Sequence, residues 1–173
     1  MVRLVCGTAL GYPYRMIRTG IGYDSHRFAA GRTLVLGGVR IEYSHGLIGH
    51  SDADVVLHAI TDAILGALGA GDIGERFPDD DPQWKDADSR RFVREAVALA
   101  EKRGLRVGNC DVTVLAQQPR LAPHKANMRA SIAGLLNVDA ADVSVKAKTN
   151  EHMGFVGREE GLAALVSVLL TDE

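Results

Sequence analysis

Apolar positions in the first half of the chain follow two different periods. Residues 17–23 alternate large or β-branched side chains with small or polar ones, which predicts a strand. Farther along, the apolar residues recur at helical spacing, at Val56, Ile60, Ile64 and Leu68. Ser51 or Asp52 is a suitable N-cap for this segment, so we expect a helix that runs from there to about Gly69.

Short elements are predicted between this strand and this helix. The run LVLGGVRI at 34–41 indicates two short strands joined through Gly37 and Gly38, because both turn positions of a tight hairpin favour positive φ. The polar segment 42–50 that follows is predicted to be a loop leading into the helix.

The second half of the chain alternates helical and strand patterns. Helical spacing predicts one helix from near Asp88 to a C-cap at Gly104, and another from near Pro123 to Leu136. Strands are predicted at 111–116, 142–149 and 162–170, and loops at 71–89, 117–123 and 151–161. The sum is an α+β fold with a four-stranded main sheet, helices layered on one face and a small hairpin.

Length and composition restrict the class of protein. The 173 residues suffice for one domain with a two-layer core, and 46% hydrophobic with 24% charged residues is typical of a globular chain. The net charge of -2 argues against a nucleic acid or an acidic membrane surface as partner, and no apolar run reaches membrane-spanning length. Cys6 and Cys110 lack metal-type spacing, which favours reduced thiols in a cytoplasmic protein.

The first fifteen residues, MVRLVCGTALGYPYR, differ from the rest. Their apolar stretch is short and is interrupted by Gly7, Gly11 and Pro13, which argues against a signal peptide. We expect residues 1–15 to be an N-terminal extension from an upstream start codon, disordered in part, before a single domain at 16–173.

Three side chains in two segments form a candidate metal site. Asp24 and His26 in GYDSH lie two residues apart at the end of the first strand pattern, so on an extended backbone they point the same way. His58 lies in the first half of the predicted helix and reaches them only through tertiary folding. Two imidazoles and one carboxylate suit zinc and leave a fourth tetrahedral position open for substrate.

The predicted helix places an aspartate four residues on either side of His58, at Asp54 and Asp62. A histidine ligand usually donates its second ring N–H to a carboxylate or carbonyl, so either aspartate is a candidate partner for His58. Two acids on a solvated helix surface are the alternative interpretation. The acids of 71–89 lack the spacing of an EF-hand loop, so calcium is not expected there.

Polar residues near these segments point to phosphate. His50 and Ser51 stand at the predicted helix N-terminus, where backbone N–H groups and the helix dipole favour an anion. The late strand ends in KTNE at 148–151, which offers a cation, a hydroxyl and a carboxylate able to hold magnesium over a diphosphate. These parts indicate phosphoryl-group chemistry, although a zinc hydrolase would use the same parts.

Several segments, in chain order, resemble a known family: GYDSHRF, LGGVRI, HSDADVVLHAITDAILGALGAGDIGERFPDDDP, DVTVLAQQPRLAPH and VKAKTNEHMGFVGREEG. From about residue 16 to 171 the chain is similar to the 2-C-methyl-D-erythritol 2,4-cyclodiphosphate synthases of non-mevalonate isoprenoid biosynthesis. The resemblance implies a phosphorus–oxygen lyase. In that reaction the 2-phosphate of 4-diphosphocytidyl-2-C-methyl-D-erythritol 2-phosphate attacks the β-phosphorus, a cyclic diphosphate forms and CMP leaves.

The resemblance also implies roles for individual residues. One zinc per subunit would be held by Asp24, His26 and His58, and Mg²⁺ or Mn²⁺ would be held by Glu151 together with the substrate diphosphate. His50 and Thr149 would stabilise the transition state. Substrate contacts are implied for Asp24, His26, His50, Ser51, Asp72, Ile73, Gly74, Phe77, Pro78, Asp79, Asp80, Asp81, Ala116, Gln117, Gln118, Pro119, Arg120, Leu121, Ala122, Lys148, Thr149, Asn150, Glu151, Phe155 and Arg158.

Within that set the segments 72–74 and 77–81 would line the methylerythritol pocket and the neighbouring ribose, and 116–122 would wrap the cytosine. The resemblance implies a homotrimer with active sites between subunits. Phe155 and Arg158 would lie near the threefold axis, where some members hold an isoprenoid diphosphate. Lys148 departs from the family pattern, which commonly has a threonine there.

Two other functions would use many of the same residues. A zinc-dependent hydrolase of a phosphoester or amide would consume water and need a general base close to the metal. A non-catalytic, isoprenoid-diphosphate-binding trimer would keep Phe155 and Arg158 and could lose the zinc ligands. The presence of all three zinc ligands and of Glu151 argues against that second alternative.

Overall fold

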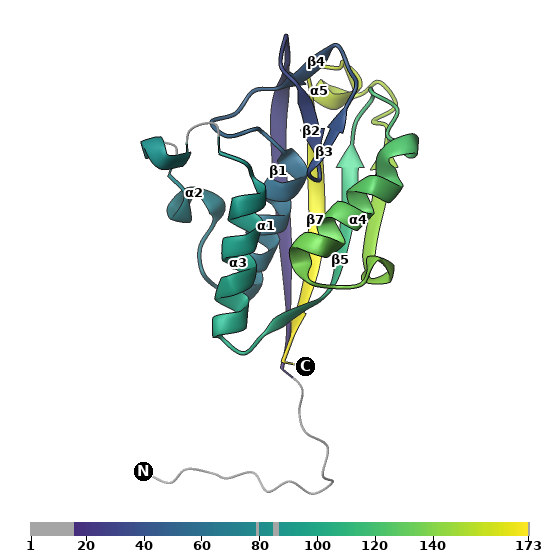
Figure 1. Ribbon diagram of the computed structural model, residues 1–173. Coiled ribbons are helices and arrows are strands. Elements are labelled where there is room, and N and C mark those ends of the chain that lie inside the picture. Colours follow the sequence, from purple (N-terminus) through teal and green to yellow (C-terminus); the bar gives the residue numbers. More distant parts are fainter. Residues whose placement is uncertain (1–15, 79, 85–86, 173) are drawn as a thin grey trace, which may run out of the picture.

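A five-stranded sheet forms the centre of the molecule, seen in a computed structural model that describes residues 16–78, 80–84 and 87–172 (Figure 1). Its strand order is β4-β1-β7-β5-β6, and β2 and β3 form a separate two-stranded hairpin. The strands are β1 (Ile17–Ala30), β2 (Leu34–Leu36), β3 (Val39–Ile41), β4 (His45–Leu47), β5 (Arg106–Leu115), β6 (Val143–Lys148) and β7 (Gly161–Thr171). The α-helices are α1 (Val55–Leu68), α2 (Ile73–Arg76), α3 (Arg90–Lys102), α4 (Lys125–Leu136) and α5 (Gly154–Gly157).

The long strand β1 pairs with β7 over most of its length. The two strands are antiparallel, from Ile17 opposite Thr171 to Arg27 opposite Gly161. On its other side β7 pairs antiparallel with β5, and β5 pairs parallel with β6. Alternate residues of β1 therefore face the helices, and these include Asp24 and His26 toward the end of the β7 pairing.

Helix α1 lies directly on β1 because two glycines remove the side chains between them. An added Cβ at Gly20 would lie 1.9 Å from the Ala63 carbonyl oxygen, and one at Gly22 would lie 1.9 Å from that of Ala59. Both distances are far below van der Waals contact, so only glycine permits this approach. The close contact fixes the height of His58 on α1 relative to Asp24 and His26 on β1.

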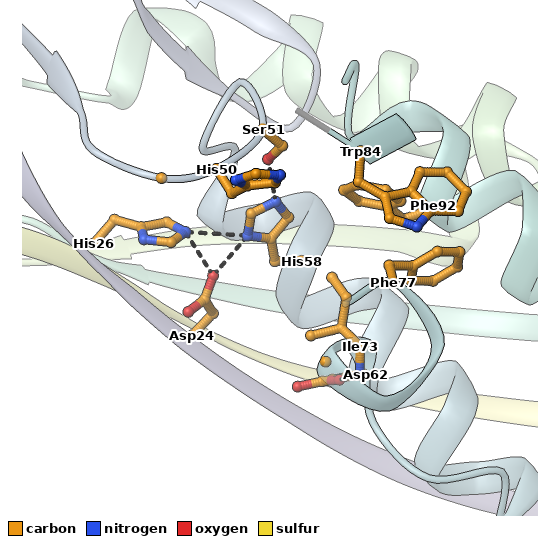
Figure 2. Close-up of a pocket in the computed structure, with 12 residues that line it drawn as sticks. Asp24, His26, His50, Ser51, His58, Asp62, Ile73, Phe77, Trp84 and Phe92 are labelled. Carbon is orange, nitrogen blue, oxygen red and sulfur yellow. Dashed lines mark hydrogen bonds and ion pairs between the residues drawn. The ribbon is translucent and has the colours of Figure 1, made fainter. Parts of the chain in front are cut away.

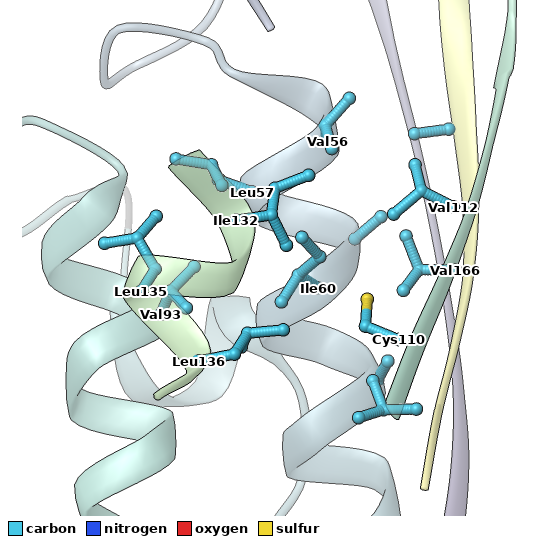
Figure 3. Close-up of a cluster of buried hydrophobic side chains, with 14 of the residues drawn as sticks. Val56, Leu57, Ile60, Val93, Cys110, Val112, Ile132, Leu135, Leu136 and Val166 are labelled. Carbon is cyan, nitrogen blue, oxygen red and sulfur yellow. The ribbon is translucent and has the colours of Figure 1, made fainter. Parts of the chain in front are cut away.

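The core lies between the sheet and a helical layer. Figure 1 shows α1, α3 and α4 on the same face of the sheet, and α1 is buried along its length except at Asp62 and Gly66. Side chains of α1 meet those of α3, α4, β5 and β7 in this core (Figure 3): Leu57, Ile60, Val93, Val112, Ile132, Leu136 and Val166. Burying such a set stabilises the fold by about 1.5–3 kcal/mol for each large apolar side chain.

The opposite face of the sheet carries exposed apolar residues. On β1, Ile17 is 60% exposed, Ile21 72% and Tyr23 52%, and on β7 Leu165 is 45% exposed. Ile17, Ile21 and Tyr23 belong to the alternation that predicted the first strand, and they point away from the core rather than into it. A contiguous apolar surface of this kind is typical of a contact with another protein surface.

The predicted α+β class, the single layer of helices and the hairpin at 34–41 are confirmed, but the four-stranded main sheet is wrong. A fifth strand, β4, lies in the segment predicted to be a loop and pairs with Phe28–Ala30 of β1. Because β1 pairs with both β4 and β7, it continues to Ala30, beyond the predicted end at residue 23. The length of these strands is set by pairing with strands distant in sequence, so the local pattern of apolar residues does not predict it.

Several helix boundaries also differ from expectation. The N-cap of α1 is Asp54 and not Ser51 or Asp52, and α3 ends at a C-cap at Arg103, followed by Gly104 at φ 71. The predicted loop 71–89 contains α2 and a 3-10 turn at Pro82–Trp84, and 151–161 contains α5. The predicted extension at 1–15, with Cys6, lies outside the described residues.

Among the described residues, no helix is long and apolar enough to cross a membrane. Cys110, in β5, is a buried free thiol, and burial raises its pKa to about 12. A thiol held in its neutral form is a weak nucleophile and a weak metal ligand, so Cys110 acts as a small apolar core residue.

Candidate metal centre and adjoining cavity

Three predicted metal ligands converge at the point where α1 begins against β1 (Figure 2). Asp24 and His26 project from the same face of β1, and His58 projects from the first turn of α1. The Asp24 Oδ2 atom lies 3.0 Å from His26 Nε2 and 2.9 Å from His58 Nδ1, and the two nitrogens are 3.0 Å apart. The sequence prediction that these three side chains meet is confirmed.

This triangle of atoms has the size that a small divalent metal needs. Tetrahedral ligands at about 2.0–2.1 Å from a metal are about 3.4 Å apart, so a slight outward movement of each side chain makes room for the ion. Three protein ligands leave one position free. Two neutral imidazole nitrogens and one carboxylate are a donor set that fits a borderline metal such as zinc.

The charge of Asp24 is maintained by its neighbours. Burial alone would raise the pKa of its carboxyl, but the adjacent imidazoles of His26 and His58 hold this pKa well below its usual range. The carboxylate is therefore present in its ligating form at neutral pH. A metal at this position would replace the imidazoles as its principal partner.

The second ring nitrogen of His58 contacts two serines and neither of the predicted aspartates. His58 Nε2 lies 2.9 Å from Ser51 Oγ and 2.9 Å from Ser89 Oγ. Ser89 precedes α3, is fully buried, and donates its hydroxyl to Asp52. The prediction that Asp54 or Asp62 orients His58 is wrong, because both aspartates accept hydrogen bonds from other groups.

Asp54 instead connects the start of α1 to the hairpin. Its carboxylate accepts the backbone N–H groups of Gly37 and Gly38 at 2.9 and 2.6 Å, and those of Val56 and Leu57 at 3.1 Å each. The side chain is fully buried, and burial raises its pKa to about 6, although the backbone donors act in the opposite direction. Asp54 thus positions the helix that carries His58.

Asp62 connects α1 to the wall of the cavity. Its carboxylate accepts the backbone N–H of Ile73 at 2.7 Å, at the first residue of α2. Partial burial raises the pKa of Asp62, while that hydrogen bond lowers it. The contact holds α2, with Ile73 and Gly74, beside the metal triad.

A cavity of about 260 Å³ opens beside the triad and has one polar and one apolar side (Figure 2). The polar side carries His50 and Ser51 in addition to the three metal ligands. His50 Nε2 is buried and, among the described residues, has no hydrogen-bond partner. A buried polar atom without a partner is costly, so this nitrogen is well placed to bind a polar group of a ligand.

Aromatic residues form the apolar side of the cavity. The rings of Phe77 and Phe92 have centroids 4.7 Å apart, and Trp84 meets Phe77 edge-to-face at 5.0 Å. Ile73 completes this wall. A metal with a free position, polar donors and an apolar wall together suit a small molecule that has an anionic group next to a hydrocarbon segment.

The other predicted site residues form a second region, which does not line this cavity. The backbone N–H of Ala116 donates to the Lys148 carbonyl, so the segments 116–122 and 148–151 lie side by side at the ends of β5 and β6. The Thr149 hydroxyl donates to Glu151 Oε1 at 2.7 Å, and both side chains are exposed. Glu151 has a positive φ of 48.

The remaining predicted contacts are distributed between these regions. Ile73, Gly74 and Phe77 line the cavity, whereas Asp72 caps α2 by accepting the Glu75 N–H. Pro78, Asp80 and Asp81 do not line it, and Asp79 lies outside the described residues. Phe155 borders a separate hollow beside Ser25, His26 and Arg27, and the exposed Arg158 forms an ion pair with Glu160.

Several residues at the site were not predicted from the sequence. Trp84 and Phe92 form the apolar wall, and Ser89 and Asp52 connect to His58. Phe77 and Trp84 were a usable signal, because large apolar side chains in a Gly- and Asp-rich loop need a partner. Nothing local indicated Ser89, which lies 31 residues from His58.

The fold and the cavity define an α+β protein with a candidate metal centre beside a part-apolar pocket, and comparison with known proteins gives its family. The YgbB family model matches residues 17–171, so the chain belongs to the YgbB family. A 2-C-methyl-D-erythritol 2,4-cyclodiphosphate synthase of Listeria monocytogenes is 56% identical over 155 residues, covering 90% of this chain and 99% of that protein.

Two further relatives extend the comparison. A bifunctional enzyme IspD/IspF of Anaeromyxobacter dehalogenans is 60% identical over 154 residues, 89% of this chain, and the chain spans 40% of its length. The solved structure of IspF from Plasmodium falciparum in complex with CDP superimposes with a TM-score of 0.79 at 38% identity, covering 89% of this chain and 95% of that one. The family resemblance inferred from the sequence is confirmed.

Proposed function

We propose that this chain is a lyase that converts 4-diphosphocytidyl-2-C-methyl-D-erythritol 2-phosphate to 2-C-methyl-D-erythritol 2,4-cyclodiphosphate and CMP, in non-mevalonate isoprenoid biosynthesis. An oxygen of the 2-phosphate forms a bond to the β-phosphorus. The bond from that phosphorus to the bridging oxygen breaks, and CMP leaves with this oxygen. The observation that carries the proposal is the triad of Asp24, His26 and His58 at a part-apolar cavity, in a chain of this family.

The metal ligands and the two sides of the cavity would bind different parts of the substrate. Zinc held by the triad would polarise the β-phosphate and orient it. His50 and Ser51 would donate hydrogen bonds to phosphate oxygens on the same side of the cavity. The apolar wall of Ile73, Phe77, Trp84 and Phe92 suits the methyl group and carbon chain of methylerythritol, and it excludes water that would otherwise compete as a nucleophile.

The second region would supply the remaining contacts. Glu151 would hold Mg²⁺ or Mn²⁺ between the substrate phosphates, since an exposed carboxylate with one neutral neighbour can add a metal ligand. Thr149 would donate its hydroxyl to the charge that develops on the transferring phosphoryl group. Backbone groups of 116–122 would bind the cytosine, and Lys148 and Asn150 would adjoin the phosphates. The CDP in a solved relative supports a cytidine nucleotide as part of the substrate.

A homotrimer with sites between subunits would bring the two regions together. The outer face of the sheet exposes Ile17, Ile21, Tyr23 and Leu165, which need an apolar partner. The second region lies apart from the cavity within one chain. Phe155 and Arg158 would then face the threefold axis, where an isoprenoid diphosphate is the proposed ligand. The proposal also includes a single domain at 16–173 that follows an N-terminal extension at 1–15. Its proposed location is the cytoplasm.

The direct test incubates purified full-length protein with this substrate, zinc and magnesium, and follows the products by phosphorus NMR. We expect CMP and a cyclic diphosphate in equal amounts. A linear phosphate product formed with consumption of water would instead identify a hydrolase. Tight binding without turnover, in protein loaded with zinc, would favour the non-catalytic alternative.

A further inference from the structure

Two residues behind the metal site form a chain of hydrogen bonds to His58. Ser89 Oγ donates to Asp52 Oδ1 at 2.5 Å and lies 2.9 Å from His58 Nε2. The backbone N–H of Ser89 also donates to Asp52 Oδ2, at 3.3 Å. Asp52 precedes α1 and Ser89 precedes α3, so the chain joins the starts of two helices behind a ligand of the proposed metal.

The direction of these hydrogen bonds determines which nitrogen of His58 carries a hydrogen. A carboxylate can only accept, so the single hydroxyl hydrogen of Ser89 goes to Asp52. Ser89 can then only accept from His58, which requires the hydrogen on Nε2. In a neutral imidazole the other nitrogen, Nδ1, is then a bare lone pair, and it faces Asp24 and His26.

Two other contacts agree with the same arrangement. Ser51 Oγ accepts the backbone N–H of Ala53 at 3.2 Å, and in the substrate-free protein its own hydrogen can go to Ser89 Oγ, which lies 3.2 Å away. All donors around Ser51 and Ser89 are then satisfied together. In the opposite tautomer the lone pairs of Ser89 and His58 Nε2 would face each other at 2.9 Å, which is repulsive.

Asp24 favours the opposite tautomer, in which His58 carries its hydrogen on Nδ1, so the Nε2–H tautomer needs support from other groups. Asp24 Oδ2 lies 2.9 Å from His58 Nδ1 and would accept a hydrogen from it. That hydrogen would occupy the lone pair that a metal requires. We infer that Asp52 and Ser89 are a positioning pair that holds His58 as the Nε2–H tautomer and so keeps its Nδ1 lone pair available to the metal.

This inference depends on the proposed function only in assuming that the triad binds a metal. Ser89 can be substituted without removing another known interaction of α3. Although Ser89 is the N-cap of α3, its side chain makes no cap hydrogen bond, so Ser89→Ala removes no helix cap. In that variant the Ser51 hydroxyl is free to donate to His58 Nε2, which favours the unsuitable tautomer. Asp52→Ala should act in the same direction, because it frees the Ser89 hydrogen. Ser51→Ala keeps the Ser89–Asp52 pair and is the matched control.

The test measures zinc affinity by competition with a chelator, and the His58 tautomer by ring ¹⁵N NMR of the metal-free protein. We expect Ser89→Ala and Asp52→Ala to weaken zinc binding by about 10–100-fold, and Ser51→Ala to weaken it far less. The hydrogen should sit on Nε2 in the unsubstituted protein and move to Nδ1 in Ser89→Ala.

A hydrogen on Nδ1 in the unsubstituted protein, or unchanged zinc affinity in Ser89→Ala, would overturn the inference. If the unsubstituted protein bound no zinc at all, the proposed metal centre would fail, and the NMR measurement would still decide the tautomer. A purely structural role for Ser89 would lower the thermal midpoint without moving the hydrogen between the two nitrogens.

Discussion

The two regions that would bind substrate differ in how far one chain defines them. The triad region is enclosed: His58 is 9% exposed, Ser89 is fully buried, and their contacts come from β1, α1 and the start of α3. The region at 148–151 is exposed, with Thr149 and Glu151 bonded mainly to each other. The first region therefore sets its geometry within one chain, and the second is arranged to meet a surface or ligand from outside.

The largest expected effect comes from His58→Ala in the enclosed region. This variant should lose bound zinc and lower turnover on the order of 10³-fold or more, because it removes one of three metal ligands. It should keep its fold, since the apolar contacts of Val56, Ile60 and Ile64 are untouched. Elemental analysis and CMP release measure the two effects.

A histidine outside the cavity provides the control for that experiment. His45→Ala, on β4, removes a ring that packs near Phe28 and Tyr43 and should leave zinc content and CMP release unchanged. Stoichiometric zinc with near-normal turnover in His58→Ala would show that the ligand assignment is wrong.

Thr149→Val tests the exposed region and should have the next largest effect. Valine keeps the size and β-branching of threonine but lacks the hydroxyl donor, so turnover should fall by about 10²–10³-fold, as for a lost oxyanion donor. Zinc content, magnesium requirement and thermal midpoint should stay the same, because Thr149 is exposed and apart from the triad. A parallel loss of zinc would show that the two regions are not independent.

Asp54 tests how the enclosed region is stabilised. Its folded pKa, raised by burial from 3.8 to about 6, lies above the unfolded value. The stabilisation from this group is therefore complete below the unfolded pKa and is lost as pH rises through the folded pKa. Asp54→Asn does not titrate, so from about pH 4 to about pH 7 the unfolding free energy of the unsubstituted protein should fall relative to the variant by about 2 kcal/mol.

Chemical denaturation at a series of pH values measures this difference. The amide has only one acceptor oxygen and cannot accept from both Gly37 and Gly38, and this adds an offset that does not vary with pH. A difference that stays constant across the series, or that grows in the opposite direction, would contradict the raised pKa.

The smallest expected effect is a shift in metal requirement. Glu151→Gln should raise the magnesium concentration for half-maximal activity by roughly tenfold, because an amide oxygen is a weaker ligand than a carboxylate. Zinc content should not change. A magnesium titration that is unmoved in Glu151→Gln but shifted in Thr149→Val would reverse the roles of these two residues.

The elements with clear periodicity were predictable from the sequence, and those set by tertiary pairing were not. The α1 pattern and the Gly37-Gly38 turn were found because local spacing and turn chemistry agree there. Strand β4 has three residues, one of them Gly46, and pairs with a part of β1 that was itself not predicted. Neither segment has an alternation long enough to indicate a strand.

The same division holds for the site. Asp24 and His26 were predictable as a pair because a strand repeats every two residues, and His58 because of its chemical type. The partners of His58 were not predictable: Ser51 and Ser89 reach Nε2 only because the start of α3 packs against the start of α1. The aspartates at helical spacing from His58 were attractive candidates, but both are bonded to backbone groups of other elements.

We propose that one active site combines the triad of one subunit with the 148–151 region of its neighbour, and this arrangement can be tested by mixing subunits. His58→Ala and Thr149→Val, each nearly inactive alone, are mixed in equal amounts under conditions that exchange subunits, with exchange verified by tagged pull-down. In a random trimer about one quarter of the sites then have both regions intact, so about one quarter of the unsubstituted activity should return. Activity no greater than the sum of the two variants, after complete exchange, would contradict a site shared between subunits.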